Sequence, residues 1–264
     1  MWAELIQTAL MTGALVMGIF IALWALSVAI NDSSIADIFW GFGFVIIVWV
    51  LWPLTEGVED RRRLILALTT IWGLRLGLYL GWRNWGKEDP RYARLRAHVE
   101  AQNKSYAIHS LVHIYLFQGF FMWLVSLVLV FSMVIDAPPS LGLVAWIGVA
   151  SWVLGMVFET VGDLQLTRFR ADPANHGKVM DQGLWRYTRH PNYFGEACVW
   201  FGFFLIAVEN PAGVVTIVSL ATILYALMGP TGKGLLERRM SKKRPDFEEY
   251  KRRTSGFFPL PPKP

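Results

Sequence analysis

Long apolar runs alternate with short polar segments along the whole chain. A helix needs about twenty apolar residues to cross a bilayer, and roughly seven runs come close to that length. The pattern therefore predicts an all-α membrane protein with seven transmembrane helices. The expected spans are 5–30, 35–54, 64–82, 108–135, 141–162, 193–208 and 212–228.

The sixth run is short, and only Glu209, Asn210 and Pro211 separate it from the seventh. This spacing predicts a tight helical hairpin. The chain has no internal repeat and no low-complexity linker, so we expect one membrane domain over 1–264 that ends in a basic tail.

Lysine and arginine gather in three segments, which set the expected orientation. Five lie in 84–107, five in the expected loop 164–192, and ten in the tail from 231. With seven spans, all three segments fall on one side, which the positive-inside rule makes cytoplasmic. The N-terminus is then outside and the C-terminus cytosolic. Three arginines at 61–63 fall on the other side, together with three acidic neighbours. Topology and attraction to lipid headgroups would also explain most of the basic residues.

The composition agrees with the membrane class. The chain is 54% hydrophobic and only 17% charged, unlike a soluble globular domain. The N-terminal MWAE has no basic region or cleavage site, so we expect the first run to be a retained span. A single cysteine, Cys198, leaves no disulfide framework or thiolate metal site within one chain.

A dense polar and basic stretch, QGLWRYTRHPNYFGE at 182–196, stands between two apolar runs. Arg186, Arg189, His190 and Asn192 lie within seven residues, with two tyrosines among them. Cationic, amide and aromatic side chains at the start of a membrane helix could bind a large anionic ligand that has aromatic parts.

Ionisable groups at membrane depth are costly and suggest function by default. Glu159 and Asp163 are four residues apart, so they share a helix face, and Arg168 and Arg170 follow closely. A purely structural explanation of these four residues is a charge network that holds the end of the fifth span to its loop. The ionisable residues in or beside the expected spans are Asp37, Arg75, Glu159, Asp163 and Glu196.

Two common kinds of site find little support. His109 and His113 share a helix face at a spacing that can hold a metal, but no second histidine box accompanies them, so we expect no metal site. The sequence also has no P-loop and no GxGxxG after a strand-like segment, which argues against a Rossmann cofactor site.

Three segments together resemble a known family. GLWRYTRHPNYFGE at 183–196, with an Asp–Arg–Arg group upstream, resembles the C-terminal domain of the steroid 5α-reductase family. RNWGKEDPRYARLR at 83–96 and RRTSGFFP at 252–259 resemble its bacterial branch. The resemblance implies a seven-span membrane enzyme that binds NADPH from the cytosolic side. Members of this family reduce the Δ4 double bond of 3-oxo steroids or the enoyl groups of lipids, so the resemblance implies such a reaction here.

The resemblance also implies which residues bind the cofactor, all within 84–264. Lys87 stands where the family has Arg, and Glu159 stands where the human enzymes have Asn, so these two depart from the pattern. The implied cofactor-binding residues are Asn84, Lys87, Arg91, Glu159, Asp163, Arg168, Arg170, Tyr187, Arg189, His190, Asn192, Glu196, Lys233 and Glu237.

Enone reduction also needs a hydrogen-bond donor at the substrate oxygen, because negative charge develops there. The family uses a tyrosine supported by a glutamate. Tyr79 in the third span is the leading candidate here, and Asp37 is the available carboxylate because the second span has no glutamate. Tyr79 would also suit an interfacial aromatic belt. Tyr115, and then a protonated Glu159, are the alternatives.

Two other classes of function stay open. Isoprenylcysteine and phospholipid methyltransferases also carry a Gly-x-x-x-x-Arg-His-Pro-x-Tyr segment and bind S-adenosylmethionine. A lipid-binding or transport protein without catalysis is the third class. In each case we expect a lipophilic small molecule and the bilayer as partners, with no nucleic acid and no obligatory protein partner. The expected location is a bacterial inner membrane, or the endoplasmic reticulum in a eukaryote.

Overall fold

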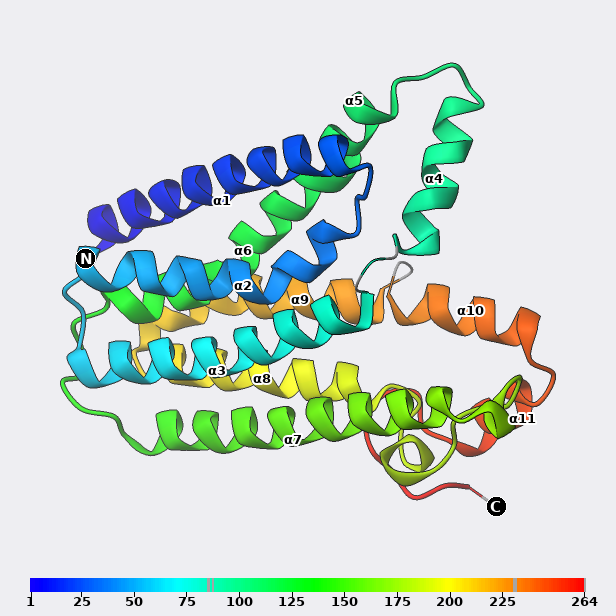
Figure 1. The fold of residues 1–264 in the computed structure, drawn as a ribbon. Coiled ribbons are helices and arrows are strands. Elements are labelled where there is room, and N and C mark those ends of the chain that lie inside the picture. The colour runs from blue at the N-terminus through cyan, green and yellow to red at the C-terminus, as the bar shows by residue number, and fades with distance from the viewer. Residues whose placement is uncertain (85, 87, 230–231, 264) are drawn as a thin grey trace. The chain divides into compact units, whose positions relative to one another are not determined.

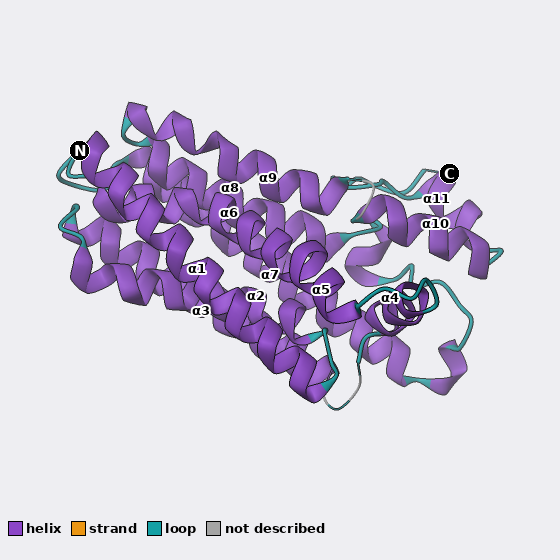
Figure 2. Cartoon of the chain, turned by 90° about the horizontal axis from the view of Figure 1, so that it is seen from above, coloured by secondary structure: helices purple, strands orange, loops and turns teal. Residues whose placement is uncertain are grey.

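The chain is helical throughout the part that is described. The computed structural model describes residues 1–84, 86, 88–229 and 232–263, and in that part the regular elements are helices and short helical turns (Figure 1, Figure 2). The α-helices are α1 Trp2–Ile30, α2 Ile35–Leu51, α3 Glu59–Asn84, α4 Pro90–Glu100, α5 Tyr106–Ser110, α6 Phe117–Val134, α7 Leu143–Ala171, α8 Pro191–Val208, α9 Ile217–Met228, α10 Lys233–Lys243 and α11 Phe247–Arg253.

Seven helical segments of the described chain are long and apolar enough to cross a membrane. Their number confirms the predicted all-α, seven-span class, and it indicates a multi-pass membrane protein. The orientation of the termini stays a prediction. The seven segments are Trp2–Ile30, Ile35–Leu54, Glu59–Asn84, Tyr106–Val134, Leu143–Ala171, Pro191–Val208 and Pro211–Lys243.

The fifth span is longer than its apolar run. Helix α7 continues through polar residues to Ala171, and Asp172 then adopts an extended conformation before Pro173, as residues that precede proline prefer. The prediction that Arg168 and Arg170 lie in a loop is therefore wrong, because both lie in the last turn of α7. An apolar count stops at the first charges, whereas leucine, glutamine and arginine are good helix formers.

The chain divides into two compact units. Unit 1 comprises Met1–Leu141 and Asn210–Ser219, and unit 2 comprises Gly142–Glu209 and Leu220–Pro264. Each unit has its own buried apolar residues, which include Phe44 and Trp72 in unit 1 and Trp200 and Phe203 in unit 2.

Helices α2 and α3 of unit 1 meet at small residues. A Cβ atom added to Gly73 would lie 2.5 Å from the carbonyl oxygen of Gly41, and one on Gly77 would lie 2.7 Å from the ring of Phe42. Glycine at such positions lets helix backbones approach closely. The contact fixes the two helices that carry Asp37 and Tyr79 against each other.

Two of the three arginines that oppose the charge rule are held by contacts within unit 1. Arg61 is fully buried and donates to the carbonyl oxygens of Ala137 and Pro138, both at 3.3 Å. Arg62 lies over the ring of Trp52, with its guanidinium carbon 4.5 Å from the ring centroid. Arg63 is exposed and pairs with Glu59. Arg61 and Arg62 therefore serve packing at the start of α3.

Helices α7 and α8 of unit 2 pack along a seam of glycines, side by side (Figure 1). A Cβ atom on Gly202 would lie 2.5 Å from the carbonyl oxygen of Gly148, and one on Gly195 would lie 2.5 Å from the backbone nitrogen of Glu159. The α7 glycines at 148, 155 and 162 recur every seven residues and so lie on one face. Any larger side chain would separate the two helices.

The end of the chain is fastened to the loop before α8. Thr188 forms a parallel bridge with Ser255, and its hydroxyl donates to the carbonyl oxygen of Phe257 at 2.8 Å. The Tyr250 hydroxyl donates to the carbonyl oxygen of Trp185 at 2.5 Å. Residues 183–190 and 247–263 therefore form one connected region of unit 2, which we call the C-terminal clasp.

Candidate functional site

The clearest polar cluster of unit 2 lies where α7 meets the first turn of α8. Glu159 is 2% exposed and Asp163 is 6% exposed, one helical turn apart. The Asn192 amide donates to Asp163 Oδ1 at 3.1 Å, and its oxygen accepts from the backbone N–H of Tyr193. The glycine seam permits this approach, because it brings α8 against the face of α7 that carries both carboxylates. The structure thus joins three predicted cofactor residues.

A cation, Arg170, lies further along the same helix face. Arg170 follows Asp163 by seven residues, which is two helical turns, and both Arg168 and Arg170 are exposed in the last turn of α7. Glu196 lies one turn after Asn192 and is half-buried. The seven residues from the buried Asp163 to the exposed Arg170 correspond to about 10 Å along the helix axis.

Arg189, His190 and Glu237 form a second cluster, also from the predicted set. The Arg189 guanidinium donates to both carboxylate oxygens of Glu237, at 3.0 and 3.3 Å, and to the carbonyl oxygens of Lys251 and Thr254. The His190 ring lies 3.1 Å from the same carboxylate. Because most of its donors bond to the protein, Arg189 holds α10 and the C-terminal clasp to the start of α8.

The environment of His190 disfavours its charged form. Burial lowers the pKa of this imidazole, and the Glu237 carboxylate only partly opposes that effect. Tyr187 and Lys233, two further predicted residues, lie nearby in the same unit. Tyr187 is 43% exposed and Lys233 opens α10, with its ammonium group close to Gly256.

The remaining predicted cofactor residues lie in unit 1 or outside the described part. Asn84 ends α3, and its buried amide nitrogen has no hydrogen-bond partner among the described residues. Arg91 is engaged by the carboxylates of Asp89 and Asp37, at 3.0 and 2.7 Å. Lys87 lies outside the described residues. Asn84 is thus a free donor in that part of the chain, whereas Arg91 is already ion-paired.

The two predicted catalytic residues have separate surroundings within unit 1. The ring of Tyr79 lies between the guanidinium carbons of Arg75 and Arg83, at 5.4 and 5.6 Å from its centroid. The Asp37 carboxylate accepts hydrogen bonds from Arg91 and, at 2.7 Å, from the hydroxyl of Tyr92.

Tyr92 and Gln118 are absent from the predicted set, yet they complete the Asp37 network. The Gln118 amide donates to the Tyr92 oxygen at 3.2 Å and accepts from the indole of Trp40 at 2.7 Å. Burial and the negative charge of Asp37 raise the pKa of Tyr92, so it stays protonated. In the sequence, Gln118 could have pointed to this network, because an amide side chain within an apolar span needs a hydrogen-bond partner.

A metal centre finds no support in the described residues, where no group of three potential ligands is present. The rings of His109 and His113 are stacked with centroids 4.3 Å apart. They lie at the π-helical turn Leu111–Leu116 and its approach, as a pair without a third ligand.

Comparisons with known proteins place the chain in a family. It is 25% identical over 263 residues to an uncharacterised protein of the fission yeast Schizosaccharomyces pombe, which covers 90% of this chain and 75% of the yeast protein. It is 34% identical over 77 residues to rat 3-oxo-5-alpha-steroid 4-dehydrogenase 1, which covers 29% of this chain and 30% of the rat enzyme.

No solved structure matches the chain. A family model described as "Protein of unknown function (DUF1295)" matches residues 23–254, which is most of the chain. The chain therefore belongs to the DUF1295 family.

Proposed function

We propose that the protein is a membrane reductase that binds NADPH and reduces the carbon–carbon double bond of an α,β-unsaturated ketone. A Δ4-3-oxo steroid, reduced to its 5α form, is the substrate class we favour. The partial similarity to the rat steroid dehydrogenase supports the oxidoreductase class.

The observation that carries this proposal is the cluster of Glu159, Asp163 and Asn192. Two carboxylates buried at a helix interface in a membrane protein are costly unless they serve a ligand or are fully compensated. A bilayer offers few hydroxyl-rich ligands, whereas a dinucleotide has ribose hydroxyls, amides and phosphates. The exposed Arg168 and Arg170 lie beyond the carboxylates on the same helix.

The side chains present fit such a cofactor. Carboxylates and amides such as Asp163 and Asn192 bind ribose hydroxyls and a carboxamide. Guanidinium groups bind phosphates, and Arg168 and Arg170 would do so. When bound, NADPH would supply a hydride to the β-carbon of the enone.

The protein's own contribution to the reaction is a proton donor at the substrate oxygen. Tyr79 is our leading candidate, because it lies on α3, one of the seven apolar spans, with the guanidinium groups of Arg75 and Arg83 near its ring. Tyr92 is a poorer donor to substrate, since its hydroxyl already donates to Asp37. Asp37 then acts as a positioning residue for α4 rather than as direct support for Tyr79.

Nucleotide binding tests the proposal. The purified protein in detergent should bind NADPH in an equilibrium titration, and S-adenosylmethionine should not compete. Tight binding of S-adenosylmethionine without binding of NADPH would instead assign the protein to the methyltransferase class. Binding of neither nucleotide would leave a non-catalytic lipid-binding role and overturn the proposal.

A further inference from the structure

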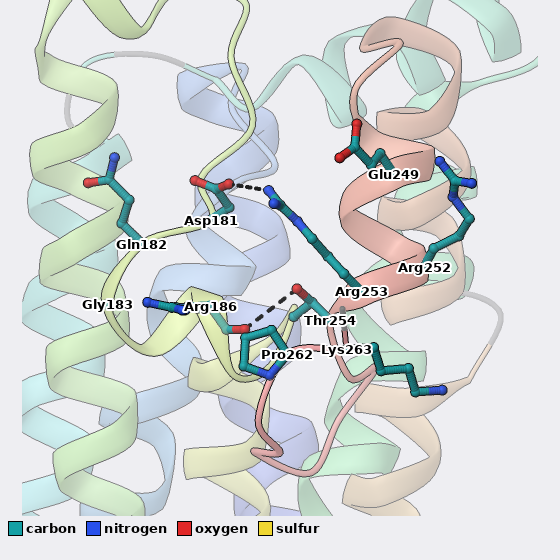
Figure 3. A pocket seen from close by; sticks show the side chains of 10 residues that line it. All are labelled: Asp181, Gln182, Gly183, Arg186, Glu249, Arg252, Arg253, Thr254, Pro262 and Lys263. Carbon is teal, nitrogen blue, oxygen red and sulfur yellow. Dashed lines mark hydrogen bonds and ion pairs between the residues drawn. The ribbon is translucent and has the colours of Figure 1, made fainter.

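A cavity of about 1080 Å³ lies in unit 2 (Figure 3). Loop residues around Arg186 form one wall, and α11 with the final residues forms the other. None of the cofactor candidates on α7 and α8 lines it. Its volume is slightly above the usual range for small-molecule sites, about 300–1,000 Å³.

The cavity wall carries an excess of positive charge. Four cationic side chains face two carboxylates in the lining, a net charge of +2. Asp181 is paired with Arg253 at 2.6 Å. Arg186, Arg252 and Lys263 are exposed and have no carboxylate partner among the described residues. Three unpaired cations therefore remain for an anionic ligand.

The C-terminal clasp fixes the cavity walls. The backbone N–H of Lys263 donates to the carbonyl oxygen of Arg253 at 2.8 Å, and that of Leu260 donates to the carbonyl oxygen of Tyr187 at 3.0 Å. With the bond from Tyr250 to Trp185, these contacts tie both walls together. The site is thus formed before any ligand binds.

Exposed apolar side chains lie in the same C-terminal segment as Lys263. Phe258 is 64% exposed and Leu260 is 55% exposed. The rings of Phe257 and Phe258 contact Phe194 in the first turn of α8, with centroids 5.9 and 6.2 Å apart. This contact sets the end of the chain at the level where the sixth span begins. Cations beside exposed apolar groups are typical of segments at a membrane surface.

We propose that this cavity binds an acidic phospholipid. Arg186, Arg252 and Lys263 would attract its phosphate, and Phe258 and Leu260 would contact the acyl chains near the glycerol. Figure 3 shows the cations spread around the cavity rather than gathered at one point. That spread suits a headgroup held by charge attraction more than a phosphate fixed by a bidentate contact.

Native mass spectrometry in a mild detergent tests the preference. With equimolar phosphatidylglycerol and phosphatidylcholine, the wild-type protein should retain more phosphatidylglycerol. The triple variant R186Q/R252Q/K263Q should lower that retention by about a hundredfold, since each cation near a surface contributes attraction to acidic lipid. The control K178Q/K242Q/K243Q removes three exposed cations outside the cavity and should keep the preference. Equal loss in both variants would reduce the effect to general charge and overturn the proposal.

Competition distinguishes the possible sources of the phosphate. Millimolar inorganic phosphate or NADPH should not displace the bound phosphatidylglycerol, whereas F258S/L260S should weaken its retention severalfold. Displacement by NADPH would reassign the cavity to the cofactor, and displacement by inorganic phosphate would make it a free-anion site. Either result, or full retention in F258S/L260S, contradicts a lipid site. Because retention is measured without substrate or turnover, this outcome is separable from that of the proposed reductase activity.

Discussion

Hydrogen bonds from polar side chains hold the buried Asp163 and the half-buried Asp37. Asp163 accepts from Asn192 in unit 2, and Asp37 accepts from Tyr92 and Arg91 in unit 1. The two carboxylates differ in their neighbours along the chain. Asp37 is ion-paired with Arg91, whereas Asp163 lies on α7 two helical turns before the exposed Arg170. For this reason we assign ligand binding to Asp163 and a positioning role to Asp37.

Asn192→Ala should weaken NADPH binding without unfolding the protein. Loss of a hydrogen bond to a charged group costs roughly 1.5–3 kcal/mol, or about ten- to a hundredfold in affinity. Asp163→Ala and Arg170→Ala should act in the same direction. Titration of the cofactor checks this, with Gln102→Ala as a control because that amide lies in unit 1, outside the cluster. Unchanged affinity in all three variants would remove the cofactor assignment.

Tyr79→Phe should lower the turnover of a Δ4-3-oxo steroid by about a hundredfold, the lower end for loss of a general acid, with little change in NADPH binding. Tyr92→Phe is the matched comparison. It leaves Asp37 short of a donor and should cost about 1–3 kcal/mol of stability rather than turnover per folded molecule. Wild-type turnover in Tyr79→Phe would move the role to Tyr115 or to a protonated Glu159.

Close packing of α7 against α8 is the element-scale feature on which the candidate site depends. The seam of glycines on α7 faces Gly195 and Gly202 on α8, and membrane helices associate largely through such packing. The carboxylates of α7 can meet Asn192 only because the two backbones approach so closely. The site and the helix pair are therefore expected to fail together.

Gly195→Ala should destabilise unit 2, because the new methyl group would overlap the backbone of Glu159. Overpacking of this kind costs about 1–3 kcal/mol, and the variant should also lose NADPH affinity. Gly18→Ala in α1 is the control, since nothing lies within 4 Å of its Cβ position and alanine there should be neutral or slightly stabilising. Equal thermal stability of the two variants would argue against the seam.

The contacts of His190 with Glu237, which connect α8 to α10, predict that the stability of the protein depends on pH. The pKa of His190 is lowered in the folded state by burial, so the unfolded chain binds its proton first as the pH falls. Its contribution to stability is present above the unfolded value of about 6.5 and is lost as the pH falls through the folded pKa. Thermal unfolding between pH 7.5 and 5 should show this loss, and His190→Asn should flatten the dependence. A wild-type melting temperature that rises on acidification would contradict it.

The sequence pattern predicted the elements better than the contacts between them. Apolar length located all seven spans, but it missed the polar end of α7 and gave no sign of α4, which is short and has four charged residues among its eleven. Tyr92 and Asp37 are 55 residues apart, so their pairing depends on tertiary packing. The seven-residue glycine repeat of α7 is visible in the chain, yet its partners on α8 become evident only in the fold.

Orientation in the membrane belongs to the whole molecule. The basic residues of 84–107, of the last turn of α7 and the loop after it, and of the tail should all face the cytosol. The three arginines at 61–63 do not overturn this expectation, because Arg61 and Arg62 are engaged in packing within unit 1 and Arg63 pairs with Glu59. The proposed lipid site carries the same implication, since acidic lipids concentrate in the cytoplasmic leaflet.

Single cysteines in a Cys198→Ser background test the orientation. Lys104→Cys should be labelled by a membrane-impermeant reagent from the cytosolic side, and Ser140→Cys from the outside. Both positions are exposed. Equal labelling of both from the cytosolic side would contradict the seven-span topology with an external N-terminus.

The fate of the hydride is the most direct test of the central claim. Purified protein should be incubated with NADPH carrying deuterium at the transferable position and with a Δ4-3-oxo steroid, and the product analysed by mass spectrometry and NMR. We predict a saturated 3-oxo steroid with one deuterium at the β-carbon, C5, and one solvent-derived hydrogen at C4. An unchanged steroid, or deuterium-free product, would contradict an NADPH-dependent reduction of the enone.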